Sequence, residues 1–385
     1  MTMEGPRALR KEELGSAIEL ADQVFRVGWG SSMAGHYPLL LSEENVDGLR
    51  VFVEDGKVVS LVGMLEREIV LLGTRHLAGS IGSVCTDPDY RGQGLATRLL
   101  LDARQKARRD GVDVFLISGS RGLYRRQDYV NVGAYHTCTI RRDQLPAAGR
   151  CVLRHWRMED VPALVRLHAA EPVRFVRPPD DFVALLGCGQ VVNRRGETRM
   201  VCRSGSDEPV GYVAYRLGGF RPQDRDTDTV TVAEMAGARW AVARVLGALL
   251  EEHDVASATV HYPASDVEFD EMARSCGWAT EPRGFPGTVG IIDAGRFWDA
   301  CAPMFQEKLG RELDALEFDA GPPVRIARGP EQIVLEDMSA LTNLVFLPRH
   351  RRGELDLGLR DGSELAGILD ELFPLPLVDY GLNYI

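Results

Sequence analysis

The sequence predicts a mixed α/β protein with two similar domains, each a twisted mixed sheet flanked by helices, followed by a small α+β domain. At 385 residues the chain is long enough for two or three cores, because domains usually run about 100 to 200 residues. A succession of strand, loop, helix, strand and helix occupies residues 79–134 and returns in the same order over residues 227–278. After Gly295 come one apolar helix, two alternating strands and two further helices. The predicted domains are 1–147, 148–296 and 297–385.

Composition and charge favour a globular protein that does not bind nucleic acid. With 45% hydrophobic and 26% charged residues, the chain has the composition of an ordered protein. Its net charge of -11 opposes nucleic-acid binding, because affinity for a polyphosphate depends on Lys and Arg. An acidic surface can steer a cationic substrate, although the need for solubility would also explain the charge. No stretch has the apolar length of a signal peptide or a membrane span, so we expect a cytoplasmic protein without a membrane partner.

Cysteine and histidine spacing predicts no metal site. The seven cysteines show no CxxC pattern, and their odd number argues against a disulfide framework, so we expect buried free thiols. The eight histidines form no HExxH or HxH pair. The cysteines are Cys85, Cys138, Cys151, Cys188, Cys202, Cys276 and Cys301.

The segment from Ser80 to Ala107 carries a candidate anion site. A strand over Ser80–Cys85 is followed by a Pro/Asp turn, and Arg91–Ala96 leads directly into an amphipathic helix. Glycines allow the backbone to approach an anion closely, and the N–H groups and dipole of a helix N-terminus favour a pyrophosphate. The fragment is neither GxGxxG nor a P-loop, which disfavours a nicotinamide or ATP site. An ordinary Gly-rich turn between strand and helix is the alternative.

Arg91, Gly94 and Ala96 occupy the fixed positions of Q/R-x-x-G-x-G/A, and here the chain resembles the GCN5-related N-acetyltransferase (GNAT) superfamily. The resemblance implies tandem GNAT folds and acetyl-CoA as co-substrate, with its pantetheine arm between two splayed central strands. Cys85 is then a wall residue rather than a nucleophile, because direct transfer from CoA requires no acyl-enzyme. The residues that the resemblance assigns to CoA are Ser83, Val84, Cys85, Arg91, Gly92, Gln93, Gly94, Leu95 and Ala96.

A second strand over Asp113–Ser118 is followed by the start of a helix that carries Tyr124 and Tyr129. In the family this position holds a tyrosine that protonates the departing CoA thiolate, which implies Tyr124 as the general acid. A phenol with a pKa near 10 is about as basic as the leaving thiolate, so the choice is chemically reasonable. Tyr129 matches the aromatic residue that packs this helix against the sheet.

The second copy of the pattern retains the order of elements but not the glycines. Where the first copy has Arg91–Ala96, this one has Glu234–Arg239, which lacks the paired glycines needed for close approach of a phosphate. We therefore expect no second CoA site and a role in walling the substrate cleft.

Two GNAT-like units followed by a domain similar to sterol carrier protein resemble the enhanced intracellular survival (Eis) family over the whole chain. Because fold does not fix function, this resemblance does not make the chain a lipid carrier. It implies that the terminal carboxylate of Ile385 reaches the active site. An α-carboxylate is a weak base for an ammonium, so holding the cation is an equal possibility, and simple packing of the tail a third. Further candidates for the substrate cleft are Phe25, Trp29, His36 and Glu66, with Glu68 as another possible base.

These observations predict an N-acyltransferase that moves an acetyl or short acyl group from acetyl-CoA to a primary amine by direct attack in a ternary complex. The resemblance implies polyamine-like, aminoglycoside or lysine acceptors and a homo-oligomer, with a ring-like hexamer as the expected form. The alternatives are a non-catalytic regulator that binds acyl-CoA or lipid, and a scaffold that does not bind CoA.

Overall fold

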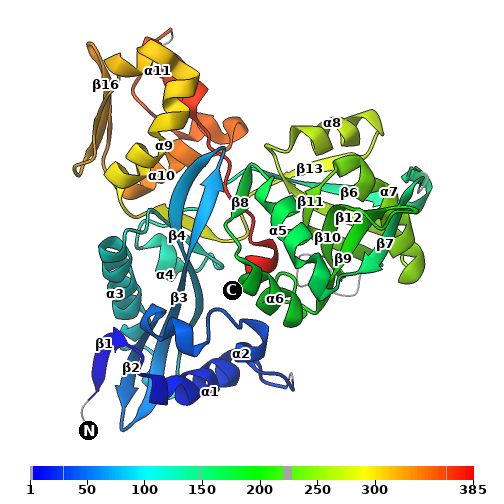
Figure 1. Cartoon of the computed structure of the whole chain (residues 1–385). Coiled ribbons are helices and arrows are strands. Elements are labelled where there is room, and N and C mark those ends of the chain that lie inside the picture. The colour runs from blue at the N-terminus through cyan, green and yellow to red at the C-terminus, as the bar shows by residue number, and fades with distance from the viewer. Residues whose placement is uncertain (1–2, 29, 147–148, 220–227, 361) are drawn as a thin grey trace. The chain divides into compact units, whose positions relative to one another are not determined.

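The computed structural model describes residues 3–28, 30–146, 149–219, 228–360 and 362–385. The chain divides into two compact units. The first contains residues 1–133, 284–377 and Ile385, and the second contains residues 134–283 and 378–384. Each unit has a mixed sheet with helices packed against it (Figure 1), which confirms the predicted α/β class.

The sheet of the first unit runs in the order β1-β2-β3-β4-β5-β14, and only β4 and β5 are parallel neighbours. Asp55 and Gly56, with φ of 48° and 76°, form the tight turn between β2 and β3. Helix α3 buries Leu99, Leu100 and Ala103 against this sheet, as expected of the predicted amphipathic helix. The strands are β1 Glu4–Ala8, β2 Leu49–Glu54, β3 Lys57–Leu71, β4 Thr74–Thr86, β5 Val114–Ile117 and β14 Thr288–Ile291, and the helices are α1 Leu14–Phe25, α2 Met33–His36, α3 Leu95–Asp110 and α4 Gly122–Arg125.

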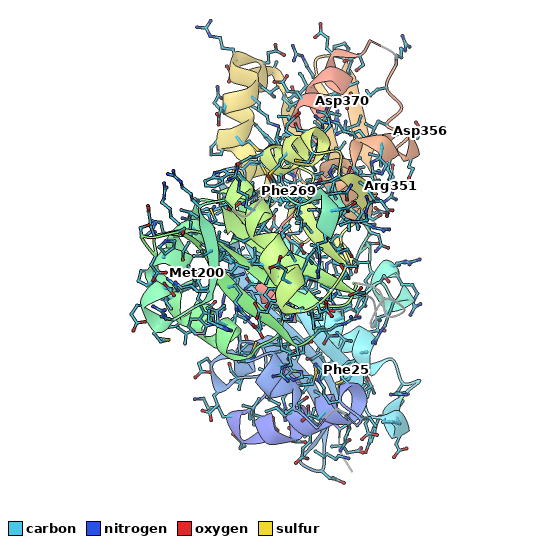
Figure 2. The ribbon with its side chains drawn as sticks, turned by 90° about the vertical axis from the view of Figure 1, so that its right-hand side faces the viewer. Phe25, Met200, Phe269, Arg351, Asp356 and Asp370 are labelled. Carbon is cyan, nitrogen blue, oxygen red and sulfur yellow. The ribbon has the colours of Figure 1, made fainter. Side chains whose placement is uncertain are left out.

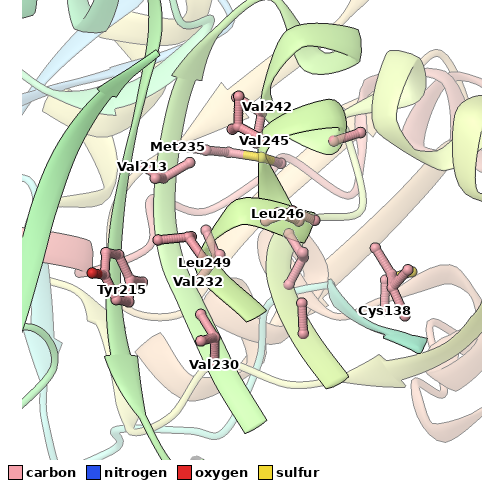
Figure 3. Packing of buried hydrophobic residues seen from close by; sticks show 14 of the residues in the cluster. Cys138, Val213, Tyr215, Val230, Val232, Met235, Val242, Val245, Leu246 and Leu249 are labelled. Carbon is pink, nitrogen blue, oxygen red and sulfur yellow. The ribbon is translucent and has the colours of Figure 1, made fainter. Parts of the chain in front are cut away.

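The sheet of the second unit runs in the order β13-β6-β12-β11-β10-β9-β7, and only β11 and β12 are parallel neighbours. In its core, Val242, Leu246 and Leu249 of α7 pack on Val230 and Val232 of β11 (Figure 3). The strands of this sheet are β6 Tyr135–Arg141, β7 Cys151–His155, β9 Gly196–Arg203, β10 Pro209–Leu217, β11 Thr229–Gly237, β12 Ser257–Pro263 and β13 Ala279–Arg283. The short strand β8 Val173–Phe175 is not part of this sheet, and the helices are α5 Val161–Ala169, α6 Pro179–Gly187, α7 Arg239–Glu252 and α8 Val267–Ser275.

The two sheets do not follow the order of the sequence. Strand β6 falls within the predicted first domain, but it pairs with β12 and β13 in the second sheet. Strand β14 falls within the predicted second domain, but it pairs with β5 in the first sheet. Strands β6 and β14 therefore each lie in a sheet that the predicted domain boundaries do not give them.

The C-terminal segment up to Leu377 belongs to the first unit. It forms a small antiparallel sheet and three helices (Figure 1). The helices and two of the strands lie at the predicted places, whereas β15 was not predicted. Its likeness to sterol carrier protein remains a prediction. The elements are α9 Ala294–Leu309, β15 Glu317–Asp319, β16 Val324–Arg328, β17 Glu331–Leu335, α10 Met338–Phe346 and α11 Glu364–Leu372.

Two local predictions were wrong. The helix expected to carry both Tyr124 and Tyr129 is a single turn that ends at Arg125, and the φ of 67° at Asp128 is incompatible with a helix that continues to Tyr129. Two cysteines are not buried: Cys276 is exposed just beyond α8, and Cys188 is partly exposed just beyond α6.

Among the helices described, none is both long and apolar enough to cross a membrane.

Candidate functional site

The two parallel strands at the centre of the first sheet separate from one another. Strands β4 and β5 pair only from Ala78 with Val114 to Ile81 with Ile117. Strand β4 then continues to Thr86, whereas the chain after β5 turns into the loop before α4. A bulge follows at Ser83, whose φ is 50°, because Gly63 pairs with Gly82 but Leu61 pairs with Cys85. The result is an opening between the two strand ends.

A cavity of about 420 Å³ lies at this opening. It includes every residue assigned to CoA from the sequence except Ser83 and Gln93. It also includes Arg121 and Arg126, which the sequence analysis missed although these basic residues lie on either side of Tyr124, just before and just after α4. The lining residues are Val24, Val84, Cys85, Thr86, Tyr90, Arg91, Gly92, Gly94, Leu95, Ala96, Thr97, Arg121, Leu123 and Arg126.

The loop before α3 has the geometry of an anion site. Gly92 and Gly94 have φ of 80° and 73°, in the left-handed region that favours glycine. No described side chain accepts a hydrogen bond from the first-turn N–H groups of α3, which begins at Leu95. The partial positive charge of a 16-residue helix and the guanidinium groups of Arg91, Arg121 and Arg126 therefore act on the same cavity. Such a site fits the phosphates of a nucleotide-bearing co-substrate.

The bulge places two small polar groups beside the opening. Burial raises the pKa of the Cys85 thiol to about 12, so Cys85 is a neutral wall residue and a poor nucleophile. The hydroxyl of Ser83 is buried, and it has no hydrogen-bond partner among the described residues. A buried hydroxyl without a partner can bind a polar group of a ligand.

Tyr124 lies in the single turn of α4 and is 4% exposed. Its ring packs on Gly119, where an added Cβ would lie 2.9 Å from the ring carbon Cε2 and 3.7 Å from the hydroxyl. Tyr124 does not line the cavity itself, although its neighbour Leu123 does. Tyr129 stacks on Phe115 of β5 with ring centroids 6.1 Å apart, which confirms its predicted packing role.

Ile385 lies against β4 in the first unit. An added Cβ on Gly82 would lie 2.8 Å from the main-chain carbonyl carbon of Ile385 and 3.1 Å from its oxygen. The contact is one residue before the bulge at Ser83, and Ile385 is only 6% exposed. The main-chain carbonyl group of Ile385 is thus adjacent to the strand that lines the opening.

The other predicted cleft residues have different surroundings. Phe25 is the partly exposed last residue of α1 (Figure 2), and Trp29 lies outside the described residues. The Nδ1 atom of His36 accepts a hydrogen bond from Arg26 at 3.1 Å, and burial, aided by Arg26, lowers the pKa of His36.

Glu66 and Glu68 are both in ion pairs. Glu66 lies 3.3 Å from Lys106, which also binds Asp110 in the last turn of α3, far along that helix from the glycine loop. Glu68 is half exposed and pairs with Arg75 at 2.9 Å. Neither lines the cavity. Across the described part of the chain, no group of three or more His, Cys, Asp or Glu side chains is placed to hold a metal ion.

Comparison with known proteins identifies the first part of the chain. The family of acetyltransferase (GNAT) domains matches residues 6–131, so this stretch is an acetyltransferase domain and the protein is an acetyltransferase. Domains of this kind take the acyl group from an acyl-CoA co-substrate, which fits the anion site at α3. A comparison with curated protein sequences gave no match.

Solved structures share the fold over the full length of the chain. A probable N-acyltransferase from Enterococcus faecalis has a TM-score of 0.66 at 14% identity, covering 98% of this chain and 99% of its own. A GCN5-related N-acetyltransferase from Kribbella flavida has a TM-score of 0.63 at 15% identity, covering 100% and 98%. Eis1 from Mycobacterium abscessus has a TM-score of 0.61 at 15% identity, covering 98% and 99%. These likenesses show a common fold.

Proposed function

We propose that the protein transfers an acetyl or similar short acyl group from acetyl-CoA to a primary amine by direct attack within a ternary complex. The observation that carries the proposal is the opening between β4 and β5, where a glycine loop, an uncapped helix N-terminus and three arginines meet in one cavity. In this proposal the N–H groups at Gly94, Leu95 and Ala96 hold the pyrophosphate, and the arginines neutralise its charge.

The unpaired part of β4 would bind the pantetheine arm. Residues 82–86 of β4 extend beyond the last residue pair with β5, so among the described residues no strand pairs with β4 on that side. An amide-bearing chain can add to such an edge through main-chain hydrogen bonds. The thioester would then lie near the bulge at Ser83, where the buried hydroxyl can bind a polar atom of the arm.

The reaction itself needs one nucleophile and one acid. The nitrogen of the amine forms a bond to the thioester carbon, the carbon–sulfur bond breaks, and the electron pair remains on sulfur. Tyr124 donates its phenolic proton to this thiolate, and the nitrogen loses its extra proton to water or to the carboxyl group of Ile385. In this proposal Ile385 can equally hold the incoming ammonium, which the approach of its main-chain carbon and oxygen to β4 at Gly82 supports.

The acceptor is proposed to be a cation, either a small polyamine-like or aminoglycoside molecule or a lysine side chain. The net charge of -11 supports this class, because an acidic surface attracts cations over several ångströms in water. The homo-oligomer implied by the family resemblance and the cytoplasmic location expected from the apolar pattern of the sequence remain predictions. Light scattering on the purified protein tests the first.

Release of free CoA thiol from acetyl-CoA over a panel of amines tests the function. Replacing Tyr124 with Phe should lower kcat by at least about 100-fold, while the affinity for CoA stays within about twofold, because general acid catalysis is lost and binding is not. Tyr129→Phe is the matched control, since the Tyr129 hydroxyl is buried without a hydrogen-bond partner among the described residues. It should leave kcat near the wild-type value.

The alternatives give different results in the same assay. Tight CoA binding without release by any amine would identify a regulator that binds acyl-CoA, and absence of CoA binding would identify a scaffold. Equal losses of kcat in the two tyrosine variants would rule out Tyr124 as a specific acid.

A further inference from the structure

The second unit has an opening of the same kind as the first. Strands β11 and β12 pair in parallel only from Thr229 with Ser257 to Val232 with Val260. A bulge at Ala233 follows in β11, because Ala214 pairs with Glu234 but Tyr215 pairs with Val232. A cavity of about 600 Å³ lies at this opening, and it is larger than the cavity in the first unit. We call it the second-unit cavity.

In the second-unit cavity, a carboxylate of the protein occupies the place at the helix N-terminus where an anionic ligand would bind. The Oε1 atom of Glu171 accepts a hydrogen bond from the Gly237 N–H at 3.0 Å, just before α7 begins. The same carboxylate binds the guanidinium of Arg239 at 3.0 Å, and Arg239 also donates to Asp266 at 2.7 Å. In the first unit the equivalent start of α3 is uncapped among the described residues. Glu171 therefore blocks a phosphate here by charge and by occupancy.

The other cations at this cavity already have partners. Arg177 is buried and forms an ion pair with Glu234 at 2.8 Å, and it donates a further hydrogen bond to Asn383 at 2.6 Å. Arg174 donates to the main-chain oxygen of Glu171 at 2.6 Å. Burial, aided by Arg177, lowers the pKa of His168 to about 3, so this imidazole is neutral at pH 7. None of these groups is available to an anionic ligand.

Two carboxylates on the cavity wall have no arginine or lysine partner among the described residues. Asp379 faces His261, with 3.2 Å between its Oδ2 atom and Nε2. Burial lowers the pKa of His261, so this histidine carries no charge at pH 7. Glu268 lies in the first turn of α8 at the rim, and no described cation pairs with it. The lining as a whole contains five carboxylates and three guanidinium groups, which leaves an excess of negative charge.

Apolar side chains form the rest of the wall. Phe175, Met235 and Tyr262 are buried, whereas Val267 at the rim is 66% exposed. A pocket with apolar walls and a few charged groups fits a ligand that has an apolar body and one polar end.

We propose that the second-unit cavity binds an organic cation, a protonated amine with an apolar body, whose ammonium group pairs with Asp379 and Glu268. Burial raises the pKa of Asp379, and an ammonium group beside it would offset the cost of a buried negative charge. The site is separate from the acetyl transfer proposed for the first unit and does not depend on it.

Calorimetric titration of the full chain with 2-phenylethylamine at pH 7 and low salt tests the proposal. The neutral 2-phenylethanol has the same apolar body and should bind at least about tenfold more weakly, because it lacks the charge. Glu268→Gln should weaken binding of the amine about three- to tenfold, and Asp379→Asn by at least as much. Glu271→Gln is the matched control: it is an exposed carboxylate on α8, it pairs with Arg274, and it does not line the cavity. It should not change the affinity.

Other outcomes would overturn the proposal. These are equal affinity for the amine and the alcohol, full amine affinity in both Glu268→Gln and Asp379→Asn, or no binding at millimolar amine. Tyr124→Phe, which removes the proposed acid in the first unit, should leave this binding unchanged. Failure of transfer and failure of amine binding are therefore separate results.

Discussion

At the scale of single residues, the site depends on glycines with two different roles. The sequence identified Gly92 and Gly94 from their spacing, because a phosphate loop requires left-handed backbone next to a helix N-terminus. The sequence did not predict a role for Gly82, because that role depends on contact with Ile385, which is 303 positions away along the chain. A close approach between distant residues leaves no local pattern to recognise.

Gly82→Ala tests whether the position of Ile385 matters. The added methyl group would lie 2.8 Å from the main-chain carbonyl carbon of Ile385, so the last residue has to move. We expect kcat for acetyl transfer to fall about tenfold or more, while the affinity for CoA stays within about twofold. Gly15→Ala on α1, where nothing lies within 4 Å of the new Cβ, is the control and should retain activity. Unchanged turnover in Gly82→Ala would contradict a role for Ile385 in the reaction.

At the scale of elements, periodicity predicted most helices and strands to within a few residues. It succeeded for α3 and α7 because their apolar faces pack on one sheet each. The periodicity did not show where β4 and β5 separate. The separation coincides with the bulge at Ser83, and a serine within a strand does not by itself indicate a bulge. The opening that forms the candidate site was therefore expected only from family resemblance.

The packing of α9 on β4 creates a pH-sensitive contact. His76 of β4 is 2% exposed, stacks on Phe297 of α9 at 4.7 Å, and has its Nε2 atom 2.9 Å from the Thr74 hydroxyl. Burial lowers the pKa of His76 to about 4. Asp113, whose carboxylate is 4.0 Å away, has its pKa raised by burial to about 6.

These two shifts have opposite effects on stability. Because the folded pKa of His76 is lower than its unfolded value of about 6.5, stability is lost as the pH falls from that value towards 4, by up to about 3 kcal/mol. The contribution of Asp113 is fully present below its unfolded pKa near 4, and it is lost as the pH rises through 6. Urea unfolding of wild type and His76→Gln at several values between pH 7 and pH 4 separates them. The variant should lose less stability on acidification, and parallel curves would contradict the prediction.

At the scale of the whole molecule, the repeat was visible in the sequence but the pairing of its strands was not. Order and spacing imply that the strands of one copy stay together, whereas β6 and β14 each pair in the sheet of the other part of the chain. Short apolar strands such as Val114–Ile117 and Thr288–Ile291 do not specify a partner by their composition. The segment 284–377 likewise joins the unit that contains the N-terminus.

Two truncated chains test the dependence of the first sheet on β14. A chain that ends at residue 283 leaves the outer edge of β5 unpaired, and an exposed strand edge promotes aggregation. A chain that ends at residue 293 differs only by the segment that contains β14 and should give a larger monodisperse fraction in size-exclusion chromatography. Equal behaviour of the two chains would show that β14 is dispensable for the first sheet.

The exchange of β14 also sets an order in time during synthesis. Roughly 170 residues, from Ser118 to Gly287, separate β5 from its partner β14, and a ribosome adds about 5 to 20 residues per second, so β5 waits roughly 10 to 30 seconds. During this interval the ribosome completes β13, the last strand of the second sheet to be made. The first sheet contains the earliest strand, β1, yet its synthesis is completed after that of the second sheet. A chaperone that covers strand edges would therefore act on the nascent chain at β5.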